Sequence, residues 1–160
     1  MTAPTDSRPT TGRATASPCG LVVVGCSRRK LPGTERVPAL ELYQGWCFPQ
    51  LRERVADRPE CRARTLVLSA RHGLLGSDDS IAPYYQVLTP ERALSQRDLV
   101  SAALAEHLER HPAREALLLL EPLYFQMLGL PPLPVVHVVS DPMAHWPQVE
   151  RVLDGWGWAA

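Results

Sequence analysis

Short apolar runs, separated by longer mixed stretches, are the main pattern of this chain. The runs are rich in Leu and Val at consecutive positions rather than at alternate ones, which is typical of strands covered on both faces. Glycine, proline or charged residues bound most of them. The pattern predicts four buried strands, over Leu21–Gly25, Thr65–Ser69, Glu115–Glu121 and Val135–Val139.

Helical periodicity fills much of the chain between these runs. The clearest helix is expected over Leu94–His111, where an apolar stripe repeats at helical spacing and Pro112 ends the pattern. That stripe consists of Leu99, Ala102, Ala103, Leu104 and Leu108. A short helix over Leu123–Leu128 and a final one over Trp146–Trp156 are also expected.

A further helix is expected to start at Pro38, because proline is favoured in a first helical turn. Gly45 and Pro49 divide this stretch into two pieces. Its shared apolar face would be Leu42, Trp46, Leu51 and Val55. The segment Ser77–Pro90 is rich in Asp, Pro and Tyr and is expected to be a long ordered loop, a kind of segment that is often functional.

Strands that alternate with helices indicate an α/β protein with a mainly parallel central sheet in a three-layer α/β/α arrangement. In such sheets, ligands bind beyond the carboxyl ends of the strands, near the point where the strand order reverses. The loops that follow the strands are therefore the first candidates for a site.

The 160-residue chain fits a single domain, expected over residues 19–160. Residues 1–18 consist largely of Thr, Ser, Ala and Pro. They have too little apolar surface to offset the entropy of ordering, so a disordered tail is expected there. No apolar run is long enough to span a bilayer, and no signal peptide is recognisable.

Lys plus Arg and Asp plus Glu number 17 each, so the formal net charge is zero. This balance disfavours nucleic acid as a partner, because phosphate neutralisation requires a basic surface. The cysteines, Cys19, Cys26, Cys47 and Cys61, form no CxxC pair. A metal site is not expected, and the cysteines are expected to be thiols of a cytoplasmic protein. No cofactor is implied, and the oligomeric state is left open.

The loop after the first strand, GCSRRK, offers Cys26, Ser27 and three cations that include Lys30. Backbone amides in a turn, together with a lysine, suit a phosphate or carboxylate. The loop matches neither GxxxxGK[ST] nor GxGxxG. An ordinary turn with solvated arginines and a structural thiol is the alternative.

The loop after the second strand, SARHG, places His72 between Ser69 and Gly73. The imidazole can titrate near neutrality, and Asp78 follows in the same region as a carboxylate that can orient it or stabilise a cation. A purely structural turn is again the alternative. A Ser-His-Asp hydrolase built from Ser27, His72 and Asp78 has little support, because GxSxG is absent.

Three aromatic residues and one carboxylate complete the candidate chemistry. Tyr84 and Tyr85 follow Pro83, and they either stack on a planar ligand or anchor their loop. Glu121 comes directly after four leucines, so partial desolvation is expected to raise its pKa and suit it to acid–base work. Capping of the following helix is its alternative role. Tyr124 lies just beyond it.

Other conspicuous residues are expected to be structural. His137 lies in an apolar strand and is expected to be a core histidine. His107 and His111 have a spacing that can bind metal, but a solvated helix end is favoured because no third ligand is near. Trp156 and Trp158 are expected to be packing anchors at the C-terminal end.

Four motifs in order, GCSRRK, ALELYQGWCF, LSARHGLL and IAPYYQVL, resemble those of an uncharacterised bacterial domain family. The family pattern reads GCSxxK, AxxLYxxxF, LSAxHGLL and PY, and the resemblance covers residues 20–110. That family is similar at a distance to the peroxide-stress YaaA proteins and to domains that accompany tRNA-guanine transglycosylases. One position departs, because Tyr85 stands where an acidic residue is expected after the PY tyrosine.

The resemblance implies a fold similar to that of uracil-DNA glycosylases and a pocket for a nucleobase or nucleotide. The family pattern falls on Cys26, Ser27, Lys30, Leu42, Tyr43, Ser69, His72, Gly73, Pro83 and Tyr84. The leading hypothesis is an enzyme that hydrolyses an N-glycosidic bond of a nucleoside or nucleotide, or exchanges its base.

Such a reaction needs a carboxylate near the ribose and a proton donor to the departing base. Glu121 or Asp78 is expected to supply the carboxylate, and His72 the donor. Lys30 would hold a phosphate, and Tyr43, Tyr84 or Tyr124 would stack on the base. A non-catalytic nucleotide-binding or nucleic-acid-binding module is one alternative, and an enzyme with Cys26 as its nucleophile is another.

Overall fold

The computed structural model of this protein describes residues 20–158. The segment expected to be a tail, residues 1–18, lies outside the described residues. In chain order the elements are β1 (Gly20–Gly25), β2 (Val37–Pro38), α1 (Ala39–Leu42), α2 (Phe48–Val55), α3 (Pro59–Ala63), β3 (Thr65–Ser69), β4 (Gly73–Gly76), β5 (Ser80–Ile81), α4 (Pro90–Arg110), β6 (Glu115–Leu119), α5 (Pro122–Leu128), β7 (Val135–Val138) and α6 (Trp146–Gly155).

Five of the strands form one sheet in the order β4-β3-β1-β6-β7. β1 is parallel to both β3 and β6, and β6 is parallel to β7. Only β4 is antiparallel to its neighbour, β3. The four strands expected from the apolar runs are therefore confirmed, and together they form the mostly parallel sheet of an α/β protein.

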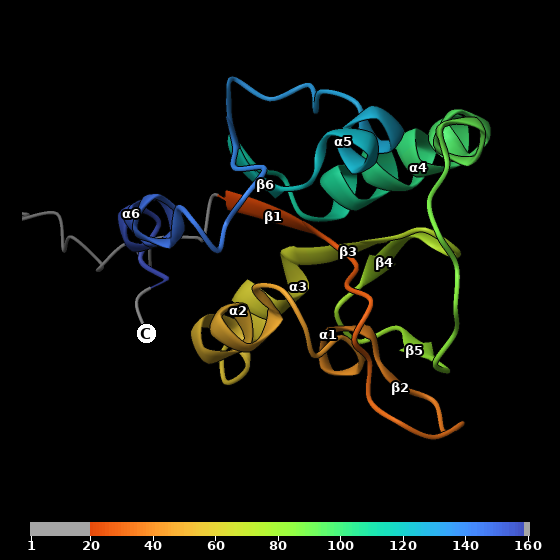
Figure 1. Ribbon diagram of the computed structural model, residues 1–160. Coiled ribbons are helices and arrows are strands. Elements are labelled where there is room, and N and C mark those ends of the chain that lie inside the picture. The colour runs from red at the N-terminus through yellow and green to blue at the C-terminus, as the bar shows by residue number, and fades with distance from the viewer. Residues whose placement is uncertain (1–19, 159–160) are drawn as a thin grey trace, which may run out of the picture.

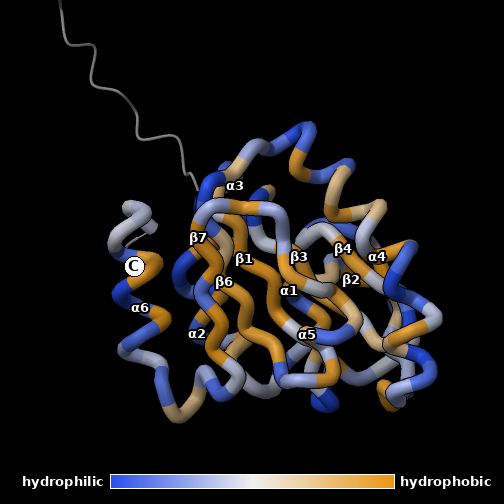
Figure 2. The backbone as a smooth tube through the Cα atoms, turned by 90° about the horizontal axis from the view of Figure 1, so that it is seen from above, coloured by the Kyte–Doolittle hydropathy of each residue, from blue (hydrophilic) through white to orange (hydrophobic). Residues whose placement is uncertain are grey.

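Helices cover both faces of this sheet (Figure 1). Val22 and Val24 of β1 pack into a core with α1, α2, α3 and α6, whereas Leu21 and Val23 pack into a second core with α4 and α5. This division follows from the alternation of side chains along a strand. The central strands are accordingly apolar along their length, and the hydrophilic segments lie at the periphery (Figure 2).

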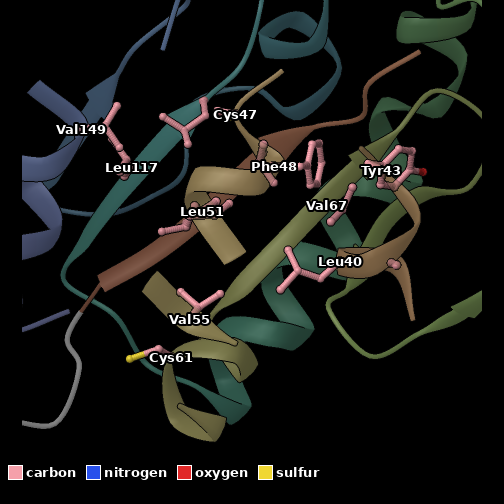
Figure 3. Close-up of a cluster of buried hydrophobic side chains, with 14 of the residues drawn as sticks. Leu40, Tyr43, Cys47, Phe48, Leu51, Val55, Cys61, Val67, Leu117 and Val149 are labelled. Carbon is pink, nitrogen blue, oxygen red and sulfur yellow. The ribbon is translucent and has the colours of Figure 1, made fainter. Parts of the chain in front are cut away.

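The core beneath α1 and α2 contains the residues that fix the position of the site. Tyr43, Phe48 and Leu51 are fully buried against β3 (Figure 3). The Tyr43 and Phe48 rings lie 5.0 Å apart. Tyr43 therefore belongs to the core, and its hydroxyl group is hydrogen-bonded to that of Tyr84.

The sequence did not predict β4, because its four residues, GLLG, contain only two apolar side chains between glycines. β4 forms a hairpin with β3, in which Gly73 pairs with Ser69 and Gly76 with Leu66. Gly73 has a positive φ of 73°, which glycine adopts at no steric cost. The candidate His72 loop, residues 70–72, is the turn of this hairpin.

Two details of the expected α4 were wrong. The helix begins at Pro90, and Thr89 accepts a hydrogen bond from the Arg92 amide as its N-cap. Leu99 is 68% exposed, whereas its neighbour Val100 is buried. The residues of α4 that are buried are Ala93, Val100, Leu104 and His107. One residue corresponds to 100° of rotation, which takes Leu99 away from the sheet.

Expectations for His107 and His137 also need correction. His107 is 7% exposed rather than solvated, and its ring lies 4.9 Å from that of His111. Burial, followed by the cations around it, lowers the pKa of His107 to about 4. His137 is half-buried rather than a core residue, because β7 is an edge strand of the sheet. Its Nε2 lies 3.5 Å from a carboxylate oxygen of Glu115.

Trp156 and Trp158 are buried and in contact with each other, as expected of packing anchors. Trp156 donates a hydrogen bond to Glu115 at the start of β6. A Cβ atom at Gly20 would overlap the Trp156 ring, so this glycine is required for the close approach. No helix among residues 20–158 has the length and apolar character needed to cross a membrane.

Candidate functional site

The carboxyl ends of β1, β3 and β6 meet at one edge of the sheet, since the three strands are parallel. β3 lies on one side of β1 and β6 lies on the other. The order in which the chain adds strands to the sheet therefore reverses at β1. A cavity of about 600 Å³ lies at this switch point. It is lined by Gly25–Lys30, Gly45, Trp46, Tyr85–Leu88, Glu121, Leu123 and Tyr124. Its size and position are typical of ligand sites in α/β sheets.

The loop after β1 is held in a defined shape by its serine. The Ser27 hydroxyl donates to the Arg29 carbonyl at 2.8 Å and accepts from the Gly45 amide at 3.3 Å. The Gln44 amide also donates to the Arg29 carbonyl. Ser27 therefore joins the β1 loop to the turn after α1. Its role is to shape the loop, and its one proton is already committed to a backbone acceptor.

Trp46 lines the cavity in a backbone conformation that is rare for its type. Its φ is 56°, the one positive φ outside glycine among residues 20–158. Such a conformation is strained for a bulky residue and persists only where the surroundings fix it. The sequence placed Trp46 on a helical face with Leu42. In the structure it lies in the turn between α1 and α2, and the nearby helix-breaking Gly45 and Pro49 were the available signal.

Cys26 contacts a residue far away in the chain at the floor of the cavity. Its sulfur lies 3.1 Å from the hydroxyl oxygen of Tyr124, the third residue of α5. Burial, followed by proximity to Cys26, raises the pKa of Tyr124. The phenol therefore keeps its proton at neutral pH and can donate it to the sulfur.

Beside the cavity, three hydroxyl groups form a connected network. Ser69 Oγ accepts hydrogen bonds from the backbone amides of Arg71 and His72, so its own proton is available for Tyr84, at 2.6 Å. The Tyr84 hydroxyl lies 2.7 Å from that of Tyr43. Burial raises the pKa of Tyr43 to about 12, and that of Tyr84 is raised as well.

Lys30 connects this network to the cavity. It lines the cavity, and its Nζ lies 4.6 Å from the centre of the Tyr84 ring and 5.7 Å from that of Tyr43. Burial lowers the pKa of Lys30, although the nearby Cys26 opposes that effect. Cys26, Lys30, Tyr43, Ser69 and Tyr84 thus gather at one end of the sheet.

His72 lies beside Tyr84 and does not line the cavity. Its ring is edge-on to that of Tyr84, with the centres 5.1 Å apart. Partial burial, followed by the charges of Arg71, Arg36 and Arg92, lowers the pKa of His72. The imidazole is therefore mainly neutral at pH 7. Arg92 fixes the turn that carries it by donating to the carbonyls of Ala70 and Arg71.

Asp78 lies far from this end of the sheet. Because β4 runs antiparallel to β3, the residues after β4 return to the start of β3, and Ser77 Oγ donates to the Thr65 carbonyl there. β3 spans about 13 Å between its ends. Asp78 pairs with Arg62 at 2.8 Å. It is thus separated from both His72 and the cavity.

Glu121 lines the cavity but is exposed, so the partial desolvation expected from the sequence is absent. It occupies the N-cap position of α5 without a capping hydrogen bond from its side chain. Besides Trp46, the sequence did not single out Gln86, Val87, Leu88 and Leu123 as lining residues, because the pattern in these segments has no chemical signature.

The fold and the cavity define an α/β protein with a crevice at the switch point of a mostly parallel sheet. The chain belongs to the family of unknown function DUF6884, which matches residues 21–153. That span extends from β1 into α6 and includes every residue that lines the cavity. No curated protein matches the chain.

Proposed function

We propose that the protein binds a nucleoside or nucleotide in the cavity between β1 and β6 and cleaves its N-glycosidic bond or exchanges its base. This proposal rests on the composition of the cavity lining. The lining combines aromatic residues (Trp46, Tyr85 and Tyr124), three cations (Arg28, Arg29 and Lys30) and one carboxylate, Glu121. Aromatic faces suit a nucleobase, and cations suit a phosphate.

Glu121 is the carboxylate of this proposal, because Asp78 lies at the other end of the sheet. Its negative charge would stabilise the oxocarbenium character that develops on the ribose. Tyr124 lies one helical turn further along α5, and its phenol keeps its proton at neutral pH. The ring of Tyr124 would stack on the base, and His72, which lies beside Tyr84 and does not line the cavity itself, would be the donor to the departing base.

The mostly parallel sheet with helices on both faces supports the wider expectation of a fold similar to uracil-DNA glycosylases. That expectation, and the distant similarity to YaaA proteins and transglycosylase-associated domains, form part of the same proposal. All of them imply a nucleobase in the crevice.

Release of free base from nucleosides and nucleotides, followed by chromatography, tests the proposal. We expect Glu121→Gln to lower the rate at least a hundredfold and His72→Ala to have a smaller effect. Glu91→Gln, an exposed carboxylate in the first turn of α4, is the matched control. If wild-type protein releases no base, or if Glu121→Gln and His72→Ala both leave the rate unchanged, the proposal is wrong.

A second candidate function is a thiol enzyme, favoured by the position of Cys26 in the cavity beside Tyr124 and close to Lys30. A phenol and an ammonium would both stabilise a thiolate. Cys26→Ser distinguishes the two functions. It abolishes turnover if the sulfur is the nucleophile, and it leaves most base release intact if Glu121 carries the reaction.

A further inference from the structure

The last residue of β1, Gly25, lacks a side chain at a point where the fold would accept one. Its φ is not among the positive values of the chain, so an alanine there is free of backbone strain. A Cβ atom at this position would lie 3.5 Å from Tyr124, 3.6 Å from Leu120 and 3.7 Å from Trp46. These are ordinary van der Waals distances, so neither backbone nor packing requires the glycine.

Trp46 and Tyr124 reach this empty position from different sides. Trp46 comes from the turn between α1 and α2 and packs against the core of that face, whereas Tyr124 comes from α5 and packs against the core of the other face. Gly25 therefore forms the floor of a slot bounded by the rings of Trp46 and Tyr124 and by Leu120. Packing against the core holds Trp46 in place despite its strained backbone.

Three cations lie along the loop that leaves this floor. Arg28, Arg29 and Lys30 all line the cavity. In the part of the chain that the structure describes, none of them forms an ion pair with a carboxylate. In a chain of zero net charge, this is a local concentration of available positive charge next to an aromatic slot.

We infer that the ligand is a nucleoside monophosphate, whose flat base lies over Gly25 between Trp46 and Tyr124 and whose phosphate binds to Arg28, Arg29 and Lys30. This inference rests on the proposed function for the choice of site and names its substrate class. A cavity of about 600 Å³ accommodates one nucleotide. The zero net charge favours a mononucleotide over a polymer, which needs an extended basic surface.

Isothermal titration calorimetry of the full chain tests the ligand class. The titrants are the four ribonucleoside 5′-monophosphates, the matching nucleosides, inorganic phosphate and a short single-stranded oligonucleotide. We expect at least one monophosphate to bind tenfold or more tightly than its nucleoside and than inorganic phosphate. Equal affinity for nucleoside and monophosphate, no binding of any monophosphate, or tighter binding of the oligonucleotide would each overturn the inference.

Gly25→Ala tests the slot. The methyl group would occupy the floor between the two rings, so we expect monophosphate affinity to fall at least tenfold while the thermal midpoint stays equal or rises. Gly155→Ala is the matched control, because no heavy atom lies within 4 Å of the added methyl group. Arg28→Gln with Lys30→Gln should weaken monophosphate binding but leave nucleoside binding nearly unchanged.

The outcomes separate this inference from the proposed function. If Gly25→Ala binds monophosphates as tightly as wild type, the slot is wrong, even if base release by Glu121 is observed. If monophosphates bind and Gly25→Ala blocks them but no base is ever released, the slot stands and the N-glycosidic reaction is wrong.

Discussion

The sulfur of Cys26 lies 3.1 Å from the hydroxyl oxygen of Tyr124, although 98 residues separate them in the chain. This contact joins the loop after β1 to the first turn of α5, which follows β6. It therefore connects the two strands that border the switch point. It places a thiol and a protonated phenol at the floor of the same cavity.

Selective alkylation of Cys26 follows from this position. Cys26 is half-buried at the cavity, whereas Cys47 and Cys61 are buried in the core. Burial raises the pKa of the Cys47 thiol to about 12 and also raises that of Cys61. In a Cys19→Ser background, iodoacetamide at pH 8 should modify Cys26 at least tenfold faster than the other two, as measured by peptide mass spectrometry.

A ligand provides the control for this experiment. A monophosphate in the cavity should slow the alkylation of Cys26 and leave Cys47 and Cys61 unaffected. Equal rates at all three thiols in folded protein would contradict the burial described above.

Removal of the Tyr84 hydroxyl should destabilise the fold. Tyr84→Phe takes away the group that joins Ser69 to Tyr43 and leaves their hydroxyls without this partner. Loss of a hydrogen-bond partner at a buried site costs about 1–3 kcal/mol in the free energy of unfolding. Urea denaturation measures this loss.

Tyr85→Phe is the matched control, because the next residue carries the same phenol at 82% exposure. Its effect should stay within about 0.5 kcal/mol. Equal effects of the two substitutions would show that the network adds nothing to stability.

His107 should make stability depend on pH in the acid range. Its pKa in the folded protein is about 4, below the ordinary value of 6.5, so the unfolded chain binds the extra proton first. Stability is therefore fully present above about pH 6.5 and falls as the pH is lowered toward 4. His111, Arg110 and Arg64 surround the imidazole and favour its neutral form.

Urea denaturation of wild type and His107→Leu at pH 8 and at pH 5 measures this effect. The variant should gain stability relative to wild type as the pH falls below 6.5, by about 1.4 kcal/mol for each pH unit, which amounts to about 2 kcal/mol at pH 5. A constant difference between His107→Leu and wild type across this range would contradict the assignment.

Arg54 should stabilise the attachment of α6. Its guanidinium is buried and donates to Asp154 and Glu150 of α6 and to the carbonyl of Trp158. Both carboxylates are partly exposed, so their loss of a partner is partly compensated by water. Arg54→Met should lower the free energy of unfolding by about 1–3 kcal/mol.

The exposed Arg151 of α6 supplies the comparison, and Arg151→Met should change stability by less than about 0.5 kcal/mol. Hydrogen exchange should show faster opening of α6 in Arg54→Met than in wild type. Unchanged protection of α6 would mean that its packing alone holds it.

The sequence by itself determined four of the five strands of the main sheet and the class of fold. Continuous apolar runs such as Leu21–Gly25 and Thr65–Ser69 are typical of strands that are buried on both faces of a sheet. The local pattern was therefore sufficient to predict these strands. The same reasoning placed Cys26, Lys30 and Ser69 near one another, because the carboxyl ends of parallel strands meet at one edge.

Only the tertiary structure decided which polar residues share a site. Asp78 is close to His72 in sequence, but the β3–β4 hairpin returns it to the opposite end of the sheet. Trp46 was expected on a helical face, whereas the break between α1 and α2 turns it into the cavity. Contacts between residues distant in the chain depend on strand order and helix rotation, and neither is encoded in a local pattern of apolar and polar residues.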